Sequence, residues 1–378
     1  LAFDRGVPVV HVDTGPSAQV MMLWSAFEPV LVTRLDDPAA AREYDPQRLE
    51  DVLGFALAPP VDDHEHEFIR VFQQEHRRVL RPRIEYPLLL ALAGVAPFRR
   101  HHWRDMSFGW TQAEWRDFRH ASDRAGALSM PIDALQSWYE WTDSLAGHFA
   151  QSHRSGHVFH FVLGAVAVVL GLSNLVLPHW SVALETALFL AVLSILANTW
   201  AANRQEWHRR WLDYRQLAER LRPMRSLKLL GVASPNNAAA NADPMSRRWV
   251  DWYAAAAWRA IGSPRGRIDA ARLGAITRTI AEWEIDPQVA YHRKAAGGAS
   301  RLHHRLEIFG TFIFAMALLS STILLAGFLL ASVGAPVRGV DLPFELPTPP
   351  GTALLAALSS GWGAMPDMRV SATGFGAG

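Results

Sequence analysis

The sequence predicts a mainly α-helical membrane protein with three to four spans, long cytoplasmic helical extensions and a truncated N-terminal α/β Rossmann-like remnant. Half of the residues are hydrophobic and only 19% are charged, and three long stretches lack charge almost completely. The formal net charge is +1. Residues 1–156 nevertheless carry 16 Arg and no Lys against 22 Asp and Glu, whereas residues 201–306 carry 19 Lys and Arg against 9. A uniform soluble domain would not usually divide its charge in this way.

The membrane spans follow from length and composition. A helix needs about 20 apolar residues to cross the hydrocarbon core, and three stretches meet this requirement: 158–177, 180–200 and 308–333. Only Pro178 and His179 separate the first two, so we expect a transmembrane hairpin. The fourth candidate, 352–366, is shorter and is flanked and interrupted by Pro and Gly.

The distribution of arginine predicts the orientation. Loops rich in Lys and Arg remain in the cytoplasm, which places the basic segment 201–306 there. Because a hairpin returns the chain to its starting side, the N-terminal region is also expected to be cytoplasmic. We expect a multi-pass protein of the bacterial inner membrane, in direct contact with the lipid bilayer.

Polar residues inside spans are functional candidates by default. Glu185, Asn174, Ser320 and Ser321 fall within the predicted spans and could line a pore or a cation path. The alternative is that Glu185 reaches the outer headgroup region while the other three form hydrogen bonds between helices. We favour this alternative.

The N-terminal run VPVVHV (7–12) is β-branched and bounded by turn residues, which is typical of a buried strand in a parallel α/β sheet. Ligands bind beyond the carboxyl ends of such strands, so Asp13, Thr14 and Gly15 are candidate ligand contacts. An ordinary strand-to-loop turn is the competing interpretation. We expect residues 1–35 to be the remnant of a ligand-sensing domain cut at Leu1, followed by a cytoplasmic helical region over 36–130.

No catalytic motif is recognisable, and the chain has no Cys, which excludes disulfides and thiolate chemistry. In VDDHEHEF (61–68) two histidines lie two residues apart, so on one helix they point to different faces, unlike the i, i+4 pair of a zinc helix. We therefore predict a solvated helix start rather than a metal site. The expectation is a protein without enzymatic activity or cofactors.

The segment NRQEWHRRWLDYRQLAERLRPMRSL (203–227) combines arginines with an aromatic seam at helical spacing: Trp207, Trp211, Tyr214, Ala218 and Leu221. Opposite charges at i, i+4 neutralise part of the arginine charge, and Asp213 is expected on the face opposite the seam. A nucleic-acid surface would leave its arginines unpaired, so we predict a stalk helix that packs on its neighbour and binds no nucleic acid. Without a visible break, the second span is expected to continue directly into this stalk.

The partner of the stalk is expected just before the first span, where apolar residues recur at three- and four-residue steps: Leu135, Trp138, Trp141, Leu145 and Phe149. The predicted organisation is a hairpin with stalks over 131–232, a linker over 233–245, a second cytoplasmic helical region over 246–306 and a C-terminal membrane region over 307–378.

The stretches YEWTDSLAGHFAQSHRSGHVFHFVLGAVAV and HRRWLDYRQLAERLRPMRSL resemble the SLATT superfamily of paired transmembrane helices with cytoplasmic extensions. In related architectures a nucleotide-sensing Rossmann-like domain of the SLOG type precedes the membrane region. The resemblance implies a homo-oligomeric, pore-like effector of bacterial immunity that responds to a nucleotide. The alternatives are a membrane-tethered nucleotide-processing enzyme with its active site upstream of Leu1, or a small transporter.

Overall fold

The computed structural model describes residues 2–3, 6–16, 18–25, 27, 36–105, 107–125, 133–231, 248–261 and 268–332. These residues are mainly helical, and three helices are long and apolar enough to cross a membrane. The predicted mainly α-helical fold class with membrane-spanning helices is thus confirmed. The chain divides into two compact units, Leu1–Ile308 and Phe309–Gly378. The predicted linker 233–245 and the candidate span 352–366 lie outside the described residues.

Three short strands form an N-terminal sheet. β1 (Val9–Val12) pairs antiparallel with β2 (Val20–Leu23), which pairs antiparallel with β3 (Ala41–Glu43). The parallel arrangement expected for the first strand is therefore wrong. Only seven residues separate β1 from β2, and a parallel crossover needs a dozen or more, so the chain returns directly as a hairpin.

Four helices fill the region before the first span. They are α1 (Pro46–Leu57), α2 (Asp63–Gln74), α3 (Glu85–Leu92) and α4 (Ser107–Arg124). Asp45 and Asp62 begin α1 and α2, because each carboxylate accepts a hydrogen bond from the backbone N–H two residues on. The helix start predicted at VDDHEHEF is therefore α2, but the prediction that it is solvated is wrong for Glu65, which is buried.

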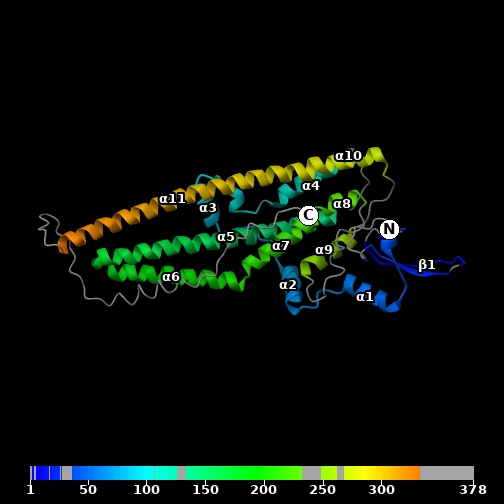
Figure 1. Ribbon diagram of the computed structural model, residues 1–378, viewed down its shortest axis with the longest axis horizontal. Helices are drawn as coiled ribbons and strands as arrows, with labels where there is room; N and C mark the ends of the chain where they lie inside the picture. Colours follow the sequence, from blue (N-terminus) through cyan, green and yellow to red (C-terminus); the bar gives the residue numbers. More distant parts are fainter. Residues whose placement is uncertain are drawn as a thin grey trace. The chain divides into compact units, whose positions relative to one another are not determined.

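The transmembrane hairpin consists of α5 (Asp133–Val176) and α6 (Ser181–Arg204), joined by a 3₁₀ turn at Pro178–Trp180. Both helices lie side by side in Figure 1. α5 has 44 residues, about 66 Å at 1.5 Å per residue, so it extends well beyond one bilayer. Large apolar side chains such as Phe161 and Val182 are exposed along the hairpin, as expected for surfaces that face lipid.

The second span does not run straight into the stalk. α6 ends at Arg204, and α7 (Trp207–Leu221) begins after Glu206, which has the left-handed φ of 48°. The predicted uninterrupted helix is therefore wrong at this point. Pro223 then separates α7 from α8 (Met224–Leu229), because proline cannot supply the backbone N–H that a continuing helix needs.

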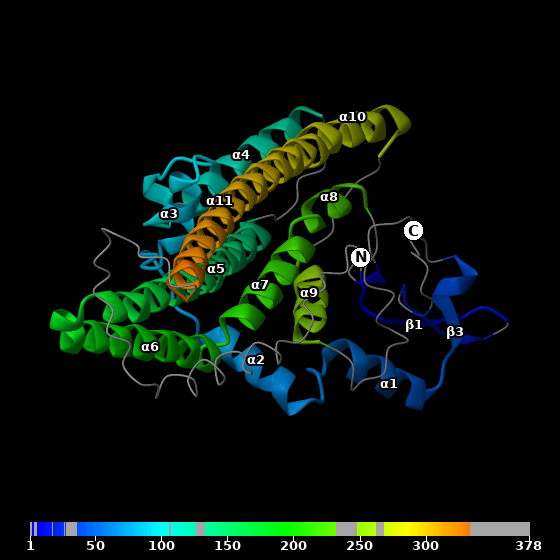
Figure 2. The same cartoon turned by 60° about the vertical axis from the view of Figure 1, so that its left-hand side comes forward.

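The main hydrophobic core lies where α7 packs against α5, α2 and α9 (Trp249–Ala260). Figure 2 shows α9 alongside α7, and α8 continuing from the end of α7. The stalk packing predicted from the sequence is present here, since buried residues of both helices meet in this core: Leu135, Leu145, Phe149, Tyr214, Leu217 and Leu221.

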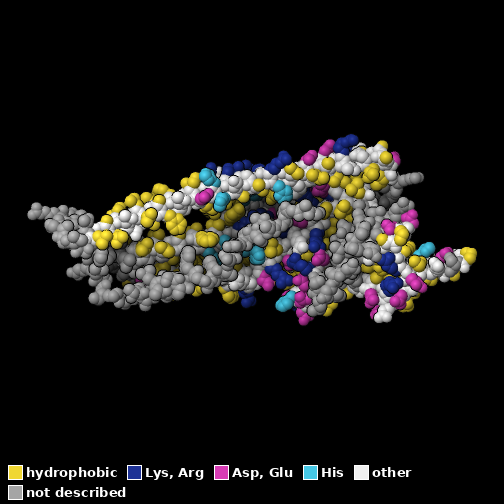
Figure 3. All heavy atoms as spheres, in the orientation of Figure 1, with side chains coloured by type: hydrophobic (Ala, Val, Ile, Leu, Met, Phe, Trp, Pro, Cys, Tyr) yellow, Lys and Arg dark blue, Asp and Glu magenta, His cyan; other side chains and the backbone are white. Residues whose placement is uncertain are grey.

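The third long helical path comprises α10 (Ala270–Ile280), a π-helical turn at Ala281–Ile285 and α11 (Asp286–Ser332). Along α11, Lys and Arg side chains precede a stretch of hydrophobic ones (Figure 3). The last of these cations is Arg305, three residues before Ile308. The charge pattern therefore marks where this helix becomes apolar enough to enter a membrane.

Candidate functional site

The N-terminal ligand candidates form the turn of the first hairpin. The backbone N–H of Gly15 donates to Oδ1 of Asp13 at 2.9 Å, and Asp13 N–H donates to the Gln19 carbonyl at 2.9 Å. This Asx turn closes the hairpin between β1 and β2. Thr14 lies in the same turn, so the structure places Asp13, Thr14 and Gly15 between antiparallel strands and not at the mouth of a parallel sheet.

Two of the polar candidates within the spans are brought together. Asn174 of α5 donates through Nδ2 to Oε1 of Glu185 on α6 at 2.7 Å, which connects the two helices near the hairpin turn. Ser320 instead donates to the Ala317 carbonyl of its own helix at 2.9 Å, and Ser321 is exposed. A pore role for these residues stays a prediction.

The stalk residues separate into two groups. Trp207, Tyr214 and Leu221 are buried in the core, and the Tyr214 hydroxyl donates to Oε1 of Glu75 at 3.1 Å. Trp211 is only partly buried and faces a pocket. Asp213, on the face opposite the predicted seam, is only 2% exposed, because α9 covers this side of α7.

Contacts with the start of α9 explain why the Asp213 carboxylate can be buried. Asp213 accepts hydrogen bonds from Trp249 Nε1 at 2.9 Å and from Arg248. Glu65 of α2 has a similar role, since it accepts from the Trp249 backbone N–H at 2.7 Å and from Arg209 at 2.9 Å. These groups fix α9 against α2 and α7, and their partners satisfy the buried charges.

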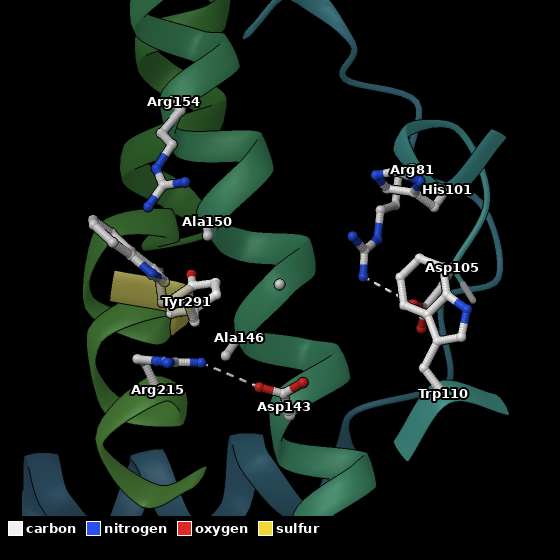
Figure 4. A pocket seen from close by; sticks show the side chains of 12 residues that line it. Arg81, His101, Asp105, Trp110, Asp143, Ala146, Ala150, Arg154, Arg215 and Tyr291 are labelled. Atoms are coloured by element: carbon white, nitrogen blue, oxygen red, sulfur yellow. Dashed lines mark hydrogen bonds and ion pairs between the residues drawn. The ribbon is translucent and has the colours of Figure 1, made fainter. Parts of the chain in front are cut away.

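A pocket of about 380 Å³ lies over the extramembrane part of α5. Figure 4 shows α5 as its floor, with Tyr291 of α11 and Arg215 of α7 on one side and the 81–110 segment on the other. Small residues on α5 leave room for the pocket: Ala146, Gly147 and Ala150. A Cβ on Gly147 would lie 3.0 Å from Nη2 of Arg81, so this glycine permits the close approach of that guanidinium.

Three arginines and two aspartates give the pocket its charge. Arg81 pairs with Asp105 at 2.8 Å, and Arg215 pairs with Asp143 at 3.3 Å. In the part of the chain that the structure describes, Arg154 has no carboxylate partner. Its guanidinium lies over the ring of Trp211 at 5.2 Å and over Tyr86 at 5.6 Å. Arg154 is therefore the cation most available to an incoming anion.

The titratable groups of the pocket are shifted by burial. Burial raises the pKa of the Asp143 carboxyl, and the Arg215 guanidinium partly offsets this shift. Burial also lowers the pKa of His101, and Arg99 and Arg81 lower it further. Because the lowered pKa keeps His101 neutral near pH 7, the cationic character of the site comes from its guanidinium groups.

Aromatic faces accompany these cations. Trp110, Trp211 and Tyr291 line the pocket from α4, α7 and α11. Guanidinium groups suit phosphate or carboxylate oxygens, and aromatic faces suit planar rings. A pocket of this size falls within the usual range for small-molecule sites. The arrangement can therefore hold an anion that carries a planar group. Among the described residues no group of His, Asp and Glu has the arrangement of a metal site.

Comparison with known proteins finds a family model that matches part of the chain. Residues 137–228 match the model of a family described as a protein of unknown function (DUF4231). A stretch of 50 residues is 52% identical to a putative nickel insertion protein of Roseiflexus castenholzii. This stretch covers 13% of this chain and 12% of that protein. The chain thus spans only a small part of that relative's length. None of the solved structures matches this chain.

The matched segment 137–228 contains the floor and one wall of the pocket, including Asp143, Arg154, Trp211 and Arg215. Arg81, Asp105 and Tyr291 come from outside it. Sequence reasoning missed the pocket because its residues are dispersed over more than 200 positions. The sequence carries only a weak signal for it, the small-residue series Ala146, Gly147 and Ala150, because small residues also occur elsewhere on α5.

Proposed function

We propose that this chain is an inner-membrane effector of a bacterial defence system, with pore-like spans that respond to a nucleotide signal. The observation that carries the proposal is that one pocket is lined by all three helical paths that lead toward a membrane. Arg154 lies on α5, Trp211 lies on α7 and Tyr291 lies on α11. A ligand held by all three helices can change how they pack.

The chemistry of the pocket favours a nucleotide. Arginine binds phosphate oxygens in bidentate geometry, and Arg154 lies beside the Trp211 ring. A base can stack on an aromatic face while its phosphates reach the guanidinium groups. In this proposal the N-terminal turn at Asp13 takes no part in binding, and the pocket has no catalytic role.

The ligand acts by shifting an equilibrium between two packings of the helices. Such a shift is possible only when the ligand binds one packing more tightly than the other. Tyr291 and Arg154 are on different helices, so a change in their separation alters the ligand's contacts directly. We propose a homo-oligomer in the cytoplasmic membrane with the pocket on the cytoplasmic side, as the basic stalk segment favours.

Binding is the first test. The full chain in detergent is titrated by calorimetry with a panel of ATP, NAD and cyclic dinucleotides. For a nucleotide that binds, Arg154→Ala is expected to weaken binding about tenfold or more, because a charged hydrogen bond contributes about 1.5–3 kcal/mol. Asp143→Asn is expected to strengthen binding, because it removes a negative charge and frees Arg215. Arg116→Ala is the matched control, with a side chain 67% exposed on α4.

Equal affinities for Arg154→Ala and Arg116→Ala would contradict the pocket assignment, as would the absence of binding by any nucleotide. The second test is dye release from liposomes that contain the full chain. Release is expected only with bound nucleotide, and no release at saturation would contradict the effector role. Turnover of the nucleotide without release would instead indicate a membrane-tethered enzyme.

A further inference from the structure

The helix α3 and the turn that follows it have an unusual surface. α3 has the sequence EYPLLLAL, and Leu88 and Leu92 are 40% and 87% exposed. Phe98, in the following turn, is 40% exposed. Apolar side chains exposed on consecutive turns of a helix usually mark a contact surface. With 8 residues, α3 is far too short to cross a bilayer.

The start of α3 lies beside the part of the hairpin where α5 and α6 become apolar. The backbone N–H of Tyr86 donates to Oγ of Ser155 at 3.1 Å. Arg83 donates through Nη1 to Oδ1 of Asn198 at 2.7 Å. Ser155 is three residues before the apolar span of α5, about 4.5 Å along the helix axis, and Asn198 belongs to the last turn of the predicted second span.

The residue that follows α3 contacts the basic part of α11. Arg305 of α11 donates to the carbonyl of Ala93 and is three residues before Ile308. Gly94 makes this contact possible, because its φ of 61° and its missing Cβ leave space for the guanidinium. Three contacts therefore connect the two ends of α3 to residues that lie close in sequence to the apolar stretches.

A basic cluster follows the apolar helix. Arg99, Arg100 and Arg104 are exposed, and none of them has a carboxylate partner among the residues that the structure describes. Exposed Leu and Phe beside unpaired Arg are the composition of segments that lie in the membrane interface, where the apolar side chains enter the acyl region and the cations bind lipid phosphates.

We infer that the segment 85–104 lies on the membrane surface and binds anionic phospholipid headgroups. Leu88, Leu92 and Phe98 insert beneath the headgroups, and Arg99 and Arg100 contact their phosphates. The contacts with Ser155 and Asn198 place the apolar surface beside the ends of the lipid-facing spans of α5 and α6, which favours lipid over a second copy of the chain as its occupant. The inference does not depend on nucleotide binding.

Because the chain has no Cys, a single introduced cysteine gives a unique labelling site. Leu92→Cys carries an environment-sensitive fluorophore, and Leu57→Cys is the matched control, since Leu57 is an apolar residue 62% exposed on α1. Both full-length variants are reconstituted into vesicles of phosphatidylcholine alone or with a one-third share of phosphatidylglycerol. Lipids with a nitroxide close to the headgroup report contact with the membrane, and aqueous iodide reports contact with water.

The label at residue 92 is expected to be quenched by the nitroxide lipid severalfold more than the label at residue 57, with iodide showing the opposite order. Phosphatidylglycerol is expected to increase the lipid quenching. Arg99→Glu with Arg100→Glu is expected to abolish that increase, because each basic residue near an anionic surface contributes roughly fivefold in affinity.

Three outcomes overturn the inference. Iodide quenching at residue 92 equal to that at residue 57 would show that the α3 surface is exposed to water. Protection from both quenchers, with disulfide formation between Leu92→Cys copies, would show that a second copy covers the helix. Lipid quenching that responds neither to phosphatidylglycerol nor to the charge reversal would show that the arginines do not bind headgroups.

Discussion

His148, in the extramembrane part of α5, is a titratable side chain whose pKa is changed by folding. The residue is 9% exposed, and burial lowers its pKa to about 4. Arg78 and Arg81 lower it further, while Asp105 opposes the shift. Because a free histidine titrates near pH 6.5, His148 stays neutral in the folded chain over most of the acidic range in which an unfolded chain binds a proton.

The first prediction follows from this difference. A depressed folded pKa contributes stability that is present above pH 6.5 and is lost as the pH falls towards 4. His148 alone should remove about 2 kcal/mol by pH 5. In His148→Gln the unfolding midpoint, measured by tryptophan fluorescence in detergent, should fall less between pH 7.5 and 5. His153, whose pKa is also lowered to about 4 by burial, accounts for part of the remaining fall. Equal falls in both proteins would refute the assignment.

At the scale of elements, the break between α6 and α7 depends on Glu206. A non-glycine residue with a left-handed φ of 48° costs about 1 kcal/mol or more. The break leaves Trp207 free to turn inward, where its ring fits against Gly156. A Cβ at that glycine would lie 3.3 Å from the Trp207 ring.

The second prediction is that Glu206→Gly raises the free energy of unfolding, because glycine adopts this φ without a steric penalty. An increase of about 0.5–1 kcal/mol is expected. Glu219→Gly, in the helical interior of α7, is the control and should lower stability by about 1 kcal/mol. Thermal unfolding of the two variants decides the matter, and a loss of stability in both would mean that residue 206 is helical in the protein.

Sequence patterns predicted the elements better than their ends and contacts. The spans of α5, α6 and α11 follow from apolar length, and the Trp207–Leu221 seam follows from helical spacing. The break at Glu206 could not be predicted, because neither glycine nor proline marks it. The burial of Asp213 depends on Trp249 of α9, 36 residues away. The pocket depends on Arg81, Arg154 and Tyr291, whose proximity is a property of packing and not of spacing.

At the scale of the whole molecule, Arg225 connects three parts of the chain. Its side chain is fully buried on α8, and its guanidinium lies 4.7 Å and 4.3 Å from the ring centres of Trp115 and Phe118 on α4. It pairs with Glu114 of α4 at 2.9 Å and with Glu284 of the π-helical turn. Arg225 thus holds the start of the third helical path against the stalk.

The third prediction concerns this connection. Arg225→Met should lower stability by about 1–3 kcal/mol, because Glu284 loses one of its two guanidinium partners and keeps only Arg222 at 3.4 Å. Adding Glu284→Gln should recover part of the loss, and the double-mutant cycle measures the coupling. Arg70→Met is the control, since Arg70 is 65% exposed and should change stability by less than about 1 kcal/mol. No recovery in the double variant would show that the two side chains act separately.

The interrupted second helix gives the hairpin two mechanically different arms. α5 is one uninterrupted helix over its 44 residues, so it can transmit a displacement along its axis. The other arm has a joint at Gln205–Glu206. We expect a displacement of the stalk to reach the far side of the bilayer along α5, while the joint absorbs it before α6. A ligand-induced displacement would then move α5 within the membrane, while α6 keeps its position.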